Sequence, residues 1–287
     1  MTPSILFWFY KEYETCKDRL EQLRSLNTDI KIFALFGGDI DDSKNAEVAV
    51  GDLVDDFYCF PCEKEPRWKW QHGDQLIFDW FEQRGKNLEW DSVFIVQWDM
   101  LVLEPVSKIF AELEPNQVVL SGMRPFQEVE SWWPWALPPR NTDLEDFQRY
   151  LGDTLNYYGP LYACLFIIVC LPKSFMAQYA KIGNPELGFL EYKMPTMAKL
   201  LNFSVFESSQ IEPWWAKDPS TWNLPANKKV LNAVASQIST RLVRDELDNP
   251  NGRRLFHPYF EPFYNKKYRL KFKIRSLLAK LVKRLPI

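Results

Sequence analysis

One apolar segment of the chain contains a carboxylate at a place where few proteins have one. Residues 92–103 read Ser-Val-Phe-Ile-Val-Gln-Trp-Asp-Met-Leu-Val-Leu, which predicts a fully buried strand with Asp99 in its second half. An ionised carboxylate is rarely buried without a partner. That partner is either a basic side chain or a divalent cation shared with a phosphorylated ligand, and the surrounding sequence favours the cation.

Strand and helix patterns alternate along the first 122 residues. Strand patterns occupy residues 4–10, 30–36, 57–60, 92–103 and 117–122, and apolar residues recur at helical spacing over 12–26, 70–83 and 105–113. This alternation predicts an α/β fold with a mostly parallel central sheet flanked by helices.

The pattern changes after Gly122. The sequence predicts helices over 143–157 and 173–181, a strand over 161–171, and a helix over 187–201 that is bent or interrupted at Pro195. The chain has no internal repeat and no linker rich in Gly or Ser. We therefore expect a single domain over residues 1–264, followed by a tail over 265–287.

Composition places the chain among globular proteins of enzyme size. It has 287 residues, of which 46% are hydrophobic, enough for one large core or two modest ones. No apolar run reaches the roughly 18 residues that a membrane-spanning helix needs. The apolar N-terminal run lacks the basic leader and cleavage site of a signal peptide, so we expect a cytoplasmic protein.

The chain has five cysteines, at positions 16, 59, 62, 164 and 170. The Cys59-Phe60-Pro61-Cys62 motif fits a redox pair, or half of a zinc site completed by Cys164 and Cys170. The last two lie in an apolar run, where a free thiol packs as a small hydrophobic group. We favour reduced thiols in a cytosolic core.

The order of the predicted elements resembles a known family. Successive βα units lead to a strand with an acidic tetrapeptide, Gln97-Trp98-Asp99-Met100, and this is similar to glycosyltransferases of the GT-A fold, which use nucleotide-sugar donors. The resemblance covers most of residues 4–260. It implies a GT-A-like fold with a Rossmann-like donor-binding half over about 1–122 and an acceptor half over 123–264.

The resemblance also implies a metal site. In this family the last Asp of a D-x-D motif binds Mn²⁺ or Mg²⁺, which holds the donor diphosphate, and a late residue, often His, adds a ligand. Asp99 and His257 match these positions, although His257 could equally be a structural residue in a Pro-flanked turn. Gln97 replaces the first acidic residue, which leaves one charge fewer for the metal. With Trp98 it is expected against the donor.

Residues at the carboxyl ends of the first two strands are further donor-binding candidates. Ligands of α/β sheets bind outside these ends, which places the backbone around Tyr10 near the nucleobase. Asp39, in the acidic segment Asp39-Ile40-Asp41-Asp42, matches an acidic residue that often contacts the base in relatives. The alternative for Asp39 is a solvated turn.

The start of the helix at residue 70 is the next donor-binding candidate. Relatives contact the ribose and base at this position, and a helix start attracts anions through its free N–H groups. Lys69 and His72 could therefore meet the donor, together with Asp74. Asp74 could equally cap the helix.

A general base must take the proton of the acceptor hydroxyl if the reaction inverts configuration. Glu191, in Phe189-Leu190-Glu191-Tyr192, lies roughly where inverting relatives carry their catalytic carboxylate. The alternative is an exposed helical glutamate, and other acidic residues compete for the role: Asp153, Glu186 and Asp218.

Two clusters of tryptophan lie in predicted loops. They are Trp132-Trp133-Pro134-Trp135 and Trp214-Trp215. Aromatic faces stack on sugar rings and also sit at the lipid headgroup level, so both clusters are acceptor-site candidates. Packing beneath a long loop is the alternative.

The tail over 265–287 contains nine Lys or Arg and no acidic residue. Its apolar residues recur at helical spacing from Ile274 to Leu285, which predicts a basic amphipathic helix on an anionic membrane surface. The alternative is an ordinary helix packed on the acidic body. Because the excess of basic over acidic residues is confined to this segment and the rest of the chain is acidic, we expect no nucleic-acid partner.

The sequence therefore predicts a peripheral membrane glycosyltransferase that uses Mn²⁺ or Mg²⁺. It would move a sugar from a nucleotide sugar to a lipid-linked, polysaccharide or other glycan acceptor. Two alternatives belong to other classes: a non-catalytic, membrane-docked module of the same fold, and a metal-dependent nucleotidyl or phosphoryl transferase.

Overall fold

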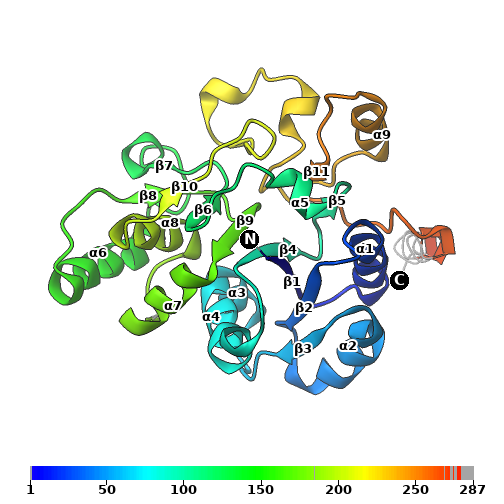
Figure 1. Cartoon of the computed structure of the whole chain (residues 1–287). Helices are drawn as coiled ribbons and strands as arrows, with labels where there is room; N and C mark the ends of the chain where they lie inside the picture. The colour runs from blue at the N-terminus through cyan, green and yellow to red at the C-terminus, as the bar shows by residue number, and fades with distance from the viewer. Residues whose placement is uncertain (1, 184, 268, 272–273, 275–276, 279–287) are drawn as a thin grey trace, which may run out of the picture.

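The computed structural model describes the whole chain except residues 1, 184, 268, 272–273, 275–276 and 279–287 (Figure 1). A seven-stranded sheet forms its centre, in the order β10-β6-β9-β4-β1-β2-β3. All neighbouring pairs are parallel except the two that include β9. The strands are β1 (Pro3–Phe9), β2 (Lys31–Phe36), β3 (Asp56–Cys59), β4 (Ser92–Gln97), β6 (Gln117–Leu120), β9 (Val169–Pro172) and β10 (Ser204–Val205). The predicted α/β fold with a mostly parallel sheet is confirmed.

Helices flank this sheet (Figure 1). The described helices are α1 (Tyr13–Leu26), α2 (Ser43–Val50), α3 (Pro66–Gln71), α4 (Gly73–Gln83), α5 (Val106–Ile109), α6 (Asn141–Leu155), α7 (Lys173–Ile182), α8 (Leu190–Leu200) and α9 (Thr240–Asp248). In α1 the residues that recur at helical spacing, Cys16, Leu20 and Leu23, are buried as predicted. Pro195 lies inside α8, which continues through it.

Several elements differ from the sequence prediction. The helix predicted over 70–83 is two helices that meet at His72, which has non-helical dihedral angles. The acidic segment that starts at Asp39 leads into a helix, α2, which we did not predict. Helix α9 and strand β10, which is only two residues long, were also missed.

The segment that contains Asp99 needs a correction. Strand β4 ends at Gln97, and Asp99 lies in a turn that leads to β5 (Leu101–Val102). Strand β5 belongs to a second sheet, where it pairs antiparallel with β11 (Leu255–Phe256). Asp99 is therefore not inside a buried strand. The apolar run over 92–103 hides this turn because strands of both sheets are apolar.

The strand predicted over 161–171 is also interrupted. It consists of β8 (Tyr162–Ala163), which pairs with β7 (Arg124–Pro125), and of β9 in the central sheet. The five residues 164–168 between them form a turn, named here the Phe166 turn. All five side chains of this turn are buried, so the sequence shows no polar residue where the strand breaks.

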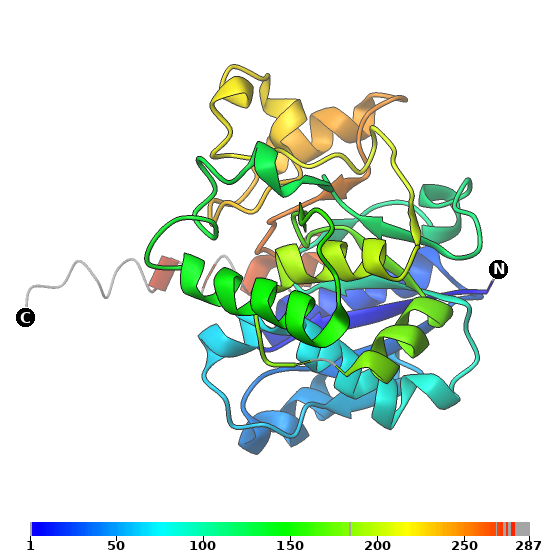
Figure 2. The same cartoon turned by 90° about the vertical axis from the view of Figure 1, so that its left-hand side faces the viewer.

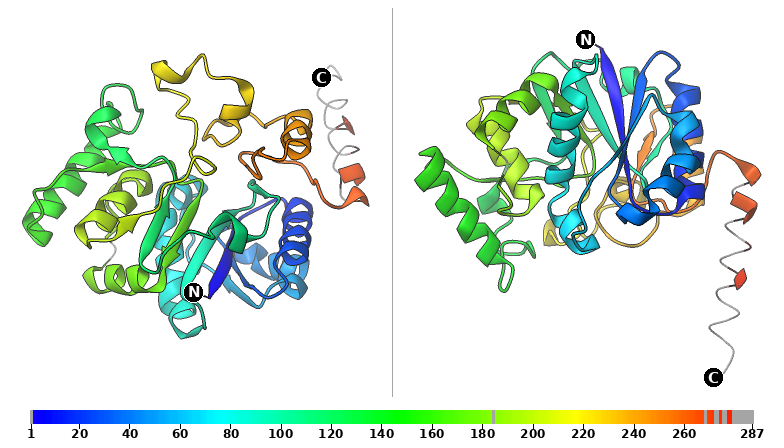
Figure 3. Two further views of the ribbon diagram at one scale, coloured as in Figure 1. Left: turned by 45° about the horizontal axis from the view of Figure 1, so that its top comes forward. Right: turned by 90° about the horizontal axis from the view of Figure 1, so that it is seen from below.

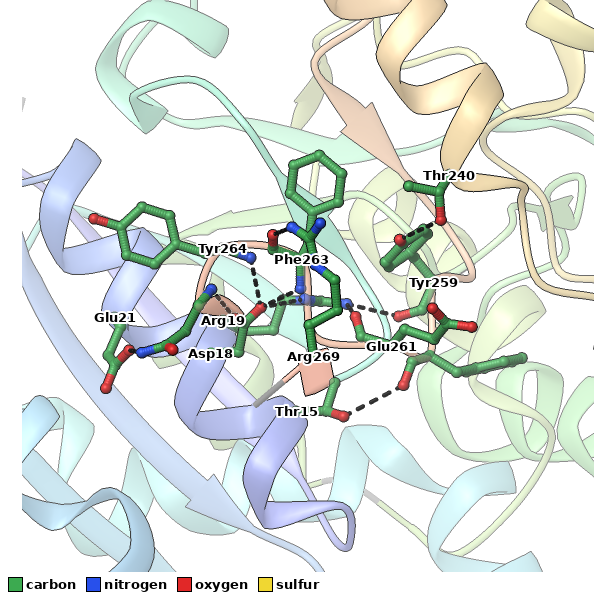
Figure 4. A network of polar contacts seen from close by, with 12 residues as sticks. Thr15, Asp18, Arg19, Glu21, Thr240, Tyr259, Glu261, Phe263, Tyr264 and Arg269 are labelled. Carbon is green, nitrogen blue, oxygen red and sulfur yellow. Dashed lines mark hydrogen bonds and ion pairs between the residues drawn. The ribbon is translucent and has the colours of Figure 1, made fainter. Parts of the chain in front are cut away.

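The C-terminal part of the chain is tied to α1 by a buried polar network (Figure 4). The carboxylate of Asp18 accepts hydrogen bonds from the backbone N–H groups of Phe263, Tyr264 and Asn265 at 2.5–3.1 Å. Arg19 forms a buried ion pair with Asp18 at 3.0 Å and donates to the carbonyl oxygens of residues 259 and 261. This network fixes residues 257–265, named here the C-terminal strap.

The helices in the described part of the chain include none that is both long and apolar enough to cross a membrane. Residues 266–267, 269–271, 274 and 277–278 of the tail are helical. The remaining tail residues on which the amphipathic prediction depends, including 279–287, lie outside the described residues.

Candidate active site

A pocket of about 1340 Å³ opens at the carboxyl ends of β1, β2 and β4. The three strands are parallel and adjacent, so the residues that follow them meet at one edge of the sheet. The Phe166 turn, the start of α8 and the C-terminal strap form other parts of the wall. The pocket is larger than the usual site for one small molecule, about 300–1000 Å³, and has room for two substrates.

Asp99 lies on the floor of this pocket, with 15% of its side chain exposed. Its backbone is fixed, because its carbonyl oxygen accepts the N–H of Tyr259 at 2.7 Å. Its Oδ1 atom has no hydrogen-bond donor among the described residues. The nearest charged partner is His257 Nε2 at 3.4 Å, longer than the 2.7–2.9 Å of a charge-assisted hydrogen bond.

His257 is held in place from the opposite side. The β5–β11 pairing brings it to Asp99, and its Nδ1 atom lies 2.6 Å from the carbonyl oxygen of Asn232. Because a carbonyl only accepts, Nδ1 carries the proton, and Nε2 faces the Asp99 carboxylate. A neutral imidazole would then present a lone pair to a carboxylate. A positive charge at this place, a proton or a metal ion, relieves that repulsion.

The charges of the pair are coupled. Burial lowers the pKa of His257, but the Asp99 carboxylate and the Asn232 carbonyl outweigh this effect and raise it above its usual value. Burial raises the pKa of Asp99, but His257 outweighs it and lowers this pKa. Both directions correspond to one positive charge beside a carboxylate.

The residues fit a divalent cation that is only partly coordinated by protein. Among the described residues, no group of three or more His, Cys, Asp or Glu could hold a metal ion. The Asp99 carboxylate and the His257 imidazole would supply two ligands to such an ion, and oxygens of a bound ligand and water would supply the rest. The five cysteines are free thiols.

Gln97 lines the pocket two residues before Asp99. Its side-chain amide Nε2 donates to the carbonyl oxygen of Phe166 at 2.7 Å. The amide group is therefore engaged by the Phe166 turn, a contact that the sequence could not show.

Glu191 lies in the first turn of α8, and its side chain reaches the pocket from the side of the Phe166 turn. Only 9% of the residue is exposed. Its Oε1 atom accepts the backbone N–H of Phe166 at 2.8 Å. Burial raises the pKa of Glu191 to about 8, although the Phe166 N–H and the charge of His257 act in the opposite direction. A carboxyl group with such a pKa can exchange a proton near neutral pH.

Several predicted donor-binding residues line the same pocket, namely Tyr10, Asp39, Lys69, Gln97 and Trp98. Tyr10 is 40% exposed and contacts Trp98 edge to face at 5.9 Å. Lys69 is buried and donates to the carbonyl oxygen of Gly38 at 2.5 Å. The Asp39 side chain accepts the N–H of Asp41 and so caps a short 3₁₀ helix.

The other two predicted donor-binding residues do not line the pocket. His72 lies at the junction of α3 and α4, with its ring 5.0 Å from that of Trp68, and burial lowers its pKa. Asp74 is fully buried and forms an ion pair with Lys193 of α8 at 2.8 Å. This pair joins the start of α4 to α8.

The five predicted acceptor-site tryptophans all line the pocket: Trp132, Trp133, Trp135, Trp214 and Trp215. They are also packed on one another and on Phe189 of the loop before α8. Trp132 and Trp133 contact Trp215 edge to face at 5.8 and 5.7 Å, and Trp135 stacks on Phe189 at 4.0 Å. The loops that carry them lie on the side of the molecule opposite the N-terminus (Figure 2).

The pocket contains residues that sequence reasoning missed. Lys11 lies 5.0–5.2 Å over the rings of Tyr10 and Trp98, and Trp70, 49% exposed, contacts Trp135 at 5.3 Å. The Phe166 turn was missed as well. Lys11 directly follows the strand predicted over 4–10, so the sequence could have placed it at the pocket. The Phe166 turn is entirely apolar, so nothing in the sequence indicated that it lines the pocket.

Comparisons with known proteins give similarity at the level of structure alone. No family model and no curated protein matches the sequence. The structure of mouse xyloside xylosyltransferase 1 is similar over 77% of this chain and 92% of the xylosyltransferase chain, at 13% sequence identity and a TM-score of 0.39. The galactosyltransferase LgtC, in a complex with donor and acceptor sugar analogues, is similar over 99% of this chain and 97% of the LgtC chain, at 14% sequence identity and a TM-score of 0.42. A cytidylyltransferase from Leptospira borgpetersenii is similar over 88% of this chain and 97% of the cytidylyltransferase chain, at 11% sequence identity and a TM-score of 0.41.

Proposed function

We propose that this chain is a metal-assisted glycosyltransferase of the GT-A type, with a donor-binding half over residues 1–122 and an acceptor half over 123–264. One observation carries the proposal. A single pocket holds the Asp99–His257 pair on its strand-end side and the buried carboxyl group of Glu191 beside a wall of tryptophans. These are the groups that transfer of a sugar from a nucleoside diphosphate requires.

The Asp99–His257 pair would hold a divalent cation. Bound there, Mn²⁺ or Mg²⁺ would neutralise the charge that develops on the diphosphate leaving group. Asp99 supplies an oxygen that accepts from no donor among the described residues, and the Asn232 carbonyl keeps the lone pair of His257 Nε2 directed at the same place. An imidazole ligand favours Mn²⁺ over Mg²⁺.

The donor would bind along the strand ends. Tyr10, Trp98 and Lys11 offer aromatic faces and a cation beside the end of β1. Asp39, which follows β2, lines the same wall, and its carboxylate would accept a hydrogen bond from a nucleobase.

 

Glu191 would act as the general base in an inverting reaction. Its Oε1 atom is held by the Phe166 N–H, and its carboxyl group reaches the pocket that also contains the proposed metal ligands. Burial raises the pKa of Glu191 to about 8. The ionised carboxylate therefore binds a proton more strongly than an ordinary glutamate does. That is the property needed to take the proton of an acceptor hydroxyl.

The tryptophan wall would bind the acceptor. Trp132 and Trp214 are half-buried and line the pocket, so part of each ring is open to a ligand. Aromatic rings of this kind stack on the apolar faces of sugars. The proposed acceptor is therefore a glycan, free or linked to a lipid.

The tail would hold the protein on an anionic membrane surface. Its described apolar residues are exposed rather than packed on the body: Leu270 at 62%, Ile274 at 49%, Leu277 at 61% and Leu278 at 56%. The tail emerges on the same side as the tryptophan loops, opposite the N-terminus (Figure 3). A membrane bound by the tail would then lie on the side where the pocket opens, which suits a lipid-linked acceptor.

Product analysis tests the proposal. The protein is incubated with a panel of nucleotide sugars, Mn²⁺ and glycan acceptors, and the nucleotide products are separated. Release of a nucleoside diphosphate with a glycosylated acceptor supports it. Release of pyrophosphate would indicate a nucleotidyl transferase, and no product with any donor, despite nucleotide binding, would indicate a non-catalytic module.

A further inference from the structure

The residue two positions before the proposed metal ligand carries an amide where a D-x-D motif has a carboxylate. Gln97 is two positions before Asp99, and its Nε2 atom donates to the carbonyl oxygen of Phe166 at 2.7 Å. This bond crosses from the end of β4 to the Phe166 turn. The amide is thus engaged in a contact that only a donor can make.

The Phe166 turn is held from three different elements. Ser121, at the end of β6, accepts the N–H of Ile168 at 3.1 Å and donates to the carbonyl oxygen of Leu165 at 2.5 Å. Gln97 binds the carbonyl oxygen of Phe166, and Glu191 of α8 accepts the N–H of the same residue at 2.8 Å. The backbone of Phe166 therefore connects Gln97 to the carboxyl group of Glu191.

We propose that Gln97 is a positioning residue, which acts through the Phe166 turn to set the position of the Glu191 carboxyl group. This inference rests on the proposed function, because it gives Glu191 its role as a base. Gln97 donates to one end of the Phe166 residue, and Glu191 accepts from the other. Removal of the first bond takes away one of the supports of the turn on which the second bond depends.

The chemistry of the contact explains why an acidic residue would fail here. A carboxylate at position 97 would place an acceptor against the carbonyl oxygen of Phe166, and two acceptors repel each other. The Phe166 carbonyl would then lose the side-chain donor that it has in the described structure. An acidic residue at position 97 would offer a ligand to the metal. Gln97 instead supports the Phe166 turn and, through it, the base Glu191.

Hydrogen exchange tests the contact without any substrate. In Gln97→Met, which has a similar length and no donor, the amide protons of residues 164–168 should exchange about tenfold faster than in the parent. Gln148→Met, at an exposed position of α6, is the matched control and should leave this exchange unchanged. Unchanged exchange in Gln97→Met overturns the proposal, even if glycosyl transfer has been demonstrated.

Kinetics and metal binding then separate positioning from metal ligation. Gln97→Met should lower turnover about tenfold or more, while the Mn²⁺-dependent affinity for a nucleoside diphosphate stays within about twofold of the parent. Gln97→Glu restores an acidic motif and should lose turnover as well. If Gln97→Glu instead binds Mn²⁺ more tightly and turns over faster, Gln97 occupies a ligand position and the proposal is wrong. If the parent protein transfers no sugar, the proposed function is wrong. The hydrogen-exchange result then still shows whether the bond from Gln97 supports the Phe166 turn.

Discussion

The pocket has two walls that are built by different means. The strand-end wall, formed by residues that follow β1, β2 and β4, is positioned by the backbone register of a parallel sheet, in which Trp8 pairs with both Leu35 and Gln97. The loop wall, formed by residues 132–135 and 214–217, is positioned by contacts between rings. Sheet hydrogen bonds fix atoms in one geometry, whereas ring contacts tolerate small shifts.

This difference matches the chemistry that we assign to each wall. A cation and a diphosphate need oxygen and nitrogen atoms at defined places, and the strand ends provide Asp99 and its partner His257. A glycan acceptor needs apolar faces over a larger area, and the loops provide tryptophans. Glu191 lines the same pocket and accepts the N–H of Phe166 in the Phe166 turn. Substitutions in the two walls should therefore affect different steps.

The largest effect is expected at the strand-end wall. Asp99→Asn removes the negative charge beside His257 and should reduce Mn²⁺-dependent nucleoside diphosphate affinity by about 10² or more, because a charged ligand to the metal is lost. Calorimetry measures this affinity directly. The matched control is Asp245→Asn, whose side chain is 61% exposed on α9. Equal affinity of Asp99→Asn and the parent would remove Asp99 from the metal site.

The next effect is expected at Glu191. Glu191→Gln keeps an oxygen that can accept the Phe166 N–H, so the fold and the donor affinity should be retained. Turnover should fall by about 10² or more, as for loss of a general base. Glu186→Gln, at an exposed side chain outside the pocket, is the matched control. A turnover number equal to that of the parent would exclude Glu191 from the reaction.

The protonation of Glu191 gives a test that needs no substrate. Folding raises its pKa from the ordinary 4.5 to about 8, so the folded state holds the proton more strongly than the unfolded state. The free energy of unfolding should therefore fall as pH rises from about 4.5 to 8. In Glu191→Gln this contribution is absent, so chemical denaturation should show its stability relative to the parent growing over that range. A constant difference between the two proteins would contradict the raised pKa.

A smaller effect is expected at the loop wall. Trp132→Ala should raise the acceptor KM about tenfold, which corresponds to about 1.4 kcal/mol of lost stacking, and should leave donor affinity unchanged. Steady-state kinetics with varied acceptor measure this. Trp222→Ala is the control, since Trp222 is 58% exposed and does not line the pocket. A change in donor affinity alone would show that the two walls do not divide the substrates as we propose.

The tail should affect only where the reaction takes place. Truncation after Lys267 keeps the three N–H groups that Asp18 binds, so the protein should fold and turn over a soluble acceptor within about twofold of the parent. Sedimentation with anionic vesicles should be lost, and high salt should weaken it in the full-length protein. Full-length protein that ignores anionic vesicles at low salt would contradict the membrane proposal.

Sequence reasoning worked best where a feature is local. The apolar periods predicted the mostly parallel sheet, and residues that follow the strands, such as Tyr10 and Asp39, line the pocket because strand ends of a parallel sheet meet. The turn after Gln97 and the Phe166 turn were missed, because apolar residues occupy both the strands and the turns. No spacing in the sequence indicates that Gln97 binds the backbone of Phe166, 69 positions later. Contacts of this kind depend on the tertiary fold.

The most direct test of the account is the metal dependence of nucleotide binding by the unmodified protein. Calorimetry with a panel of nucleoside diphosphates, each with and without Mn²⁺, measures it. We expect at least one nucleoside diphosphate to bind about tenfold or more tightly with Mn²⁺, because the cation would join the diphosphate to Asp99 and His257. Equal affinity with and without Mn²⁺, or no binding of any nucleoside diphosphate, would contradict the proposed site.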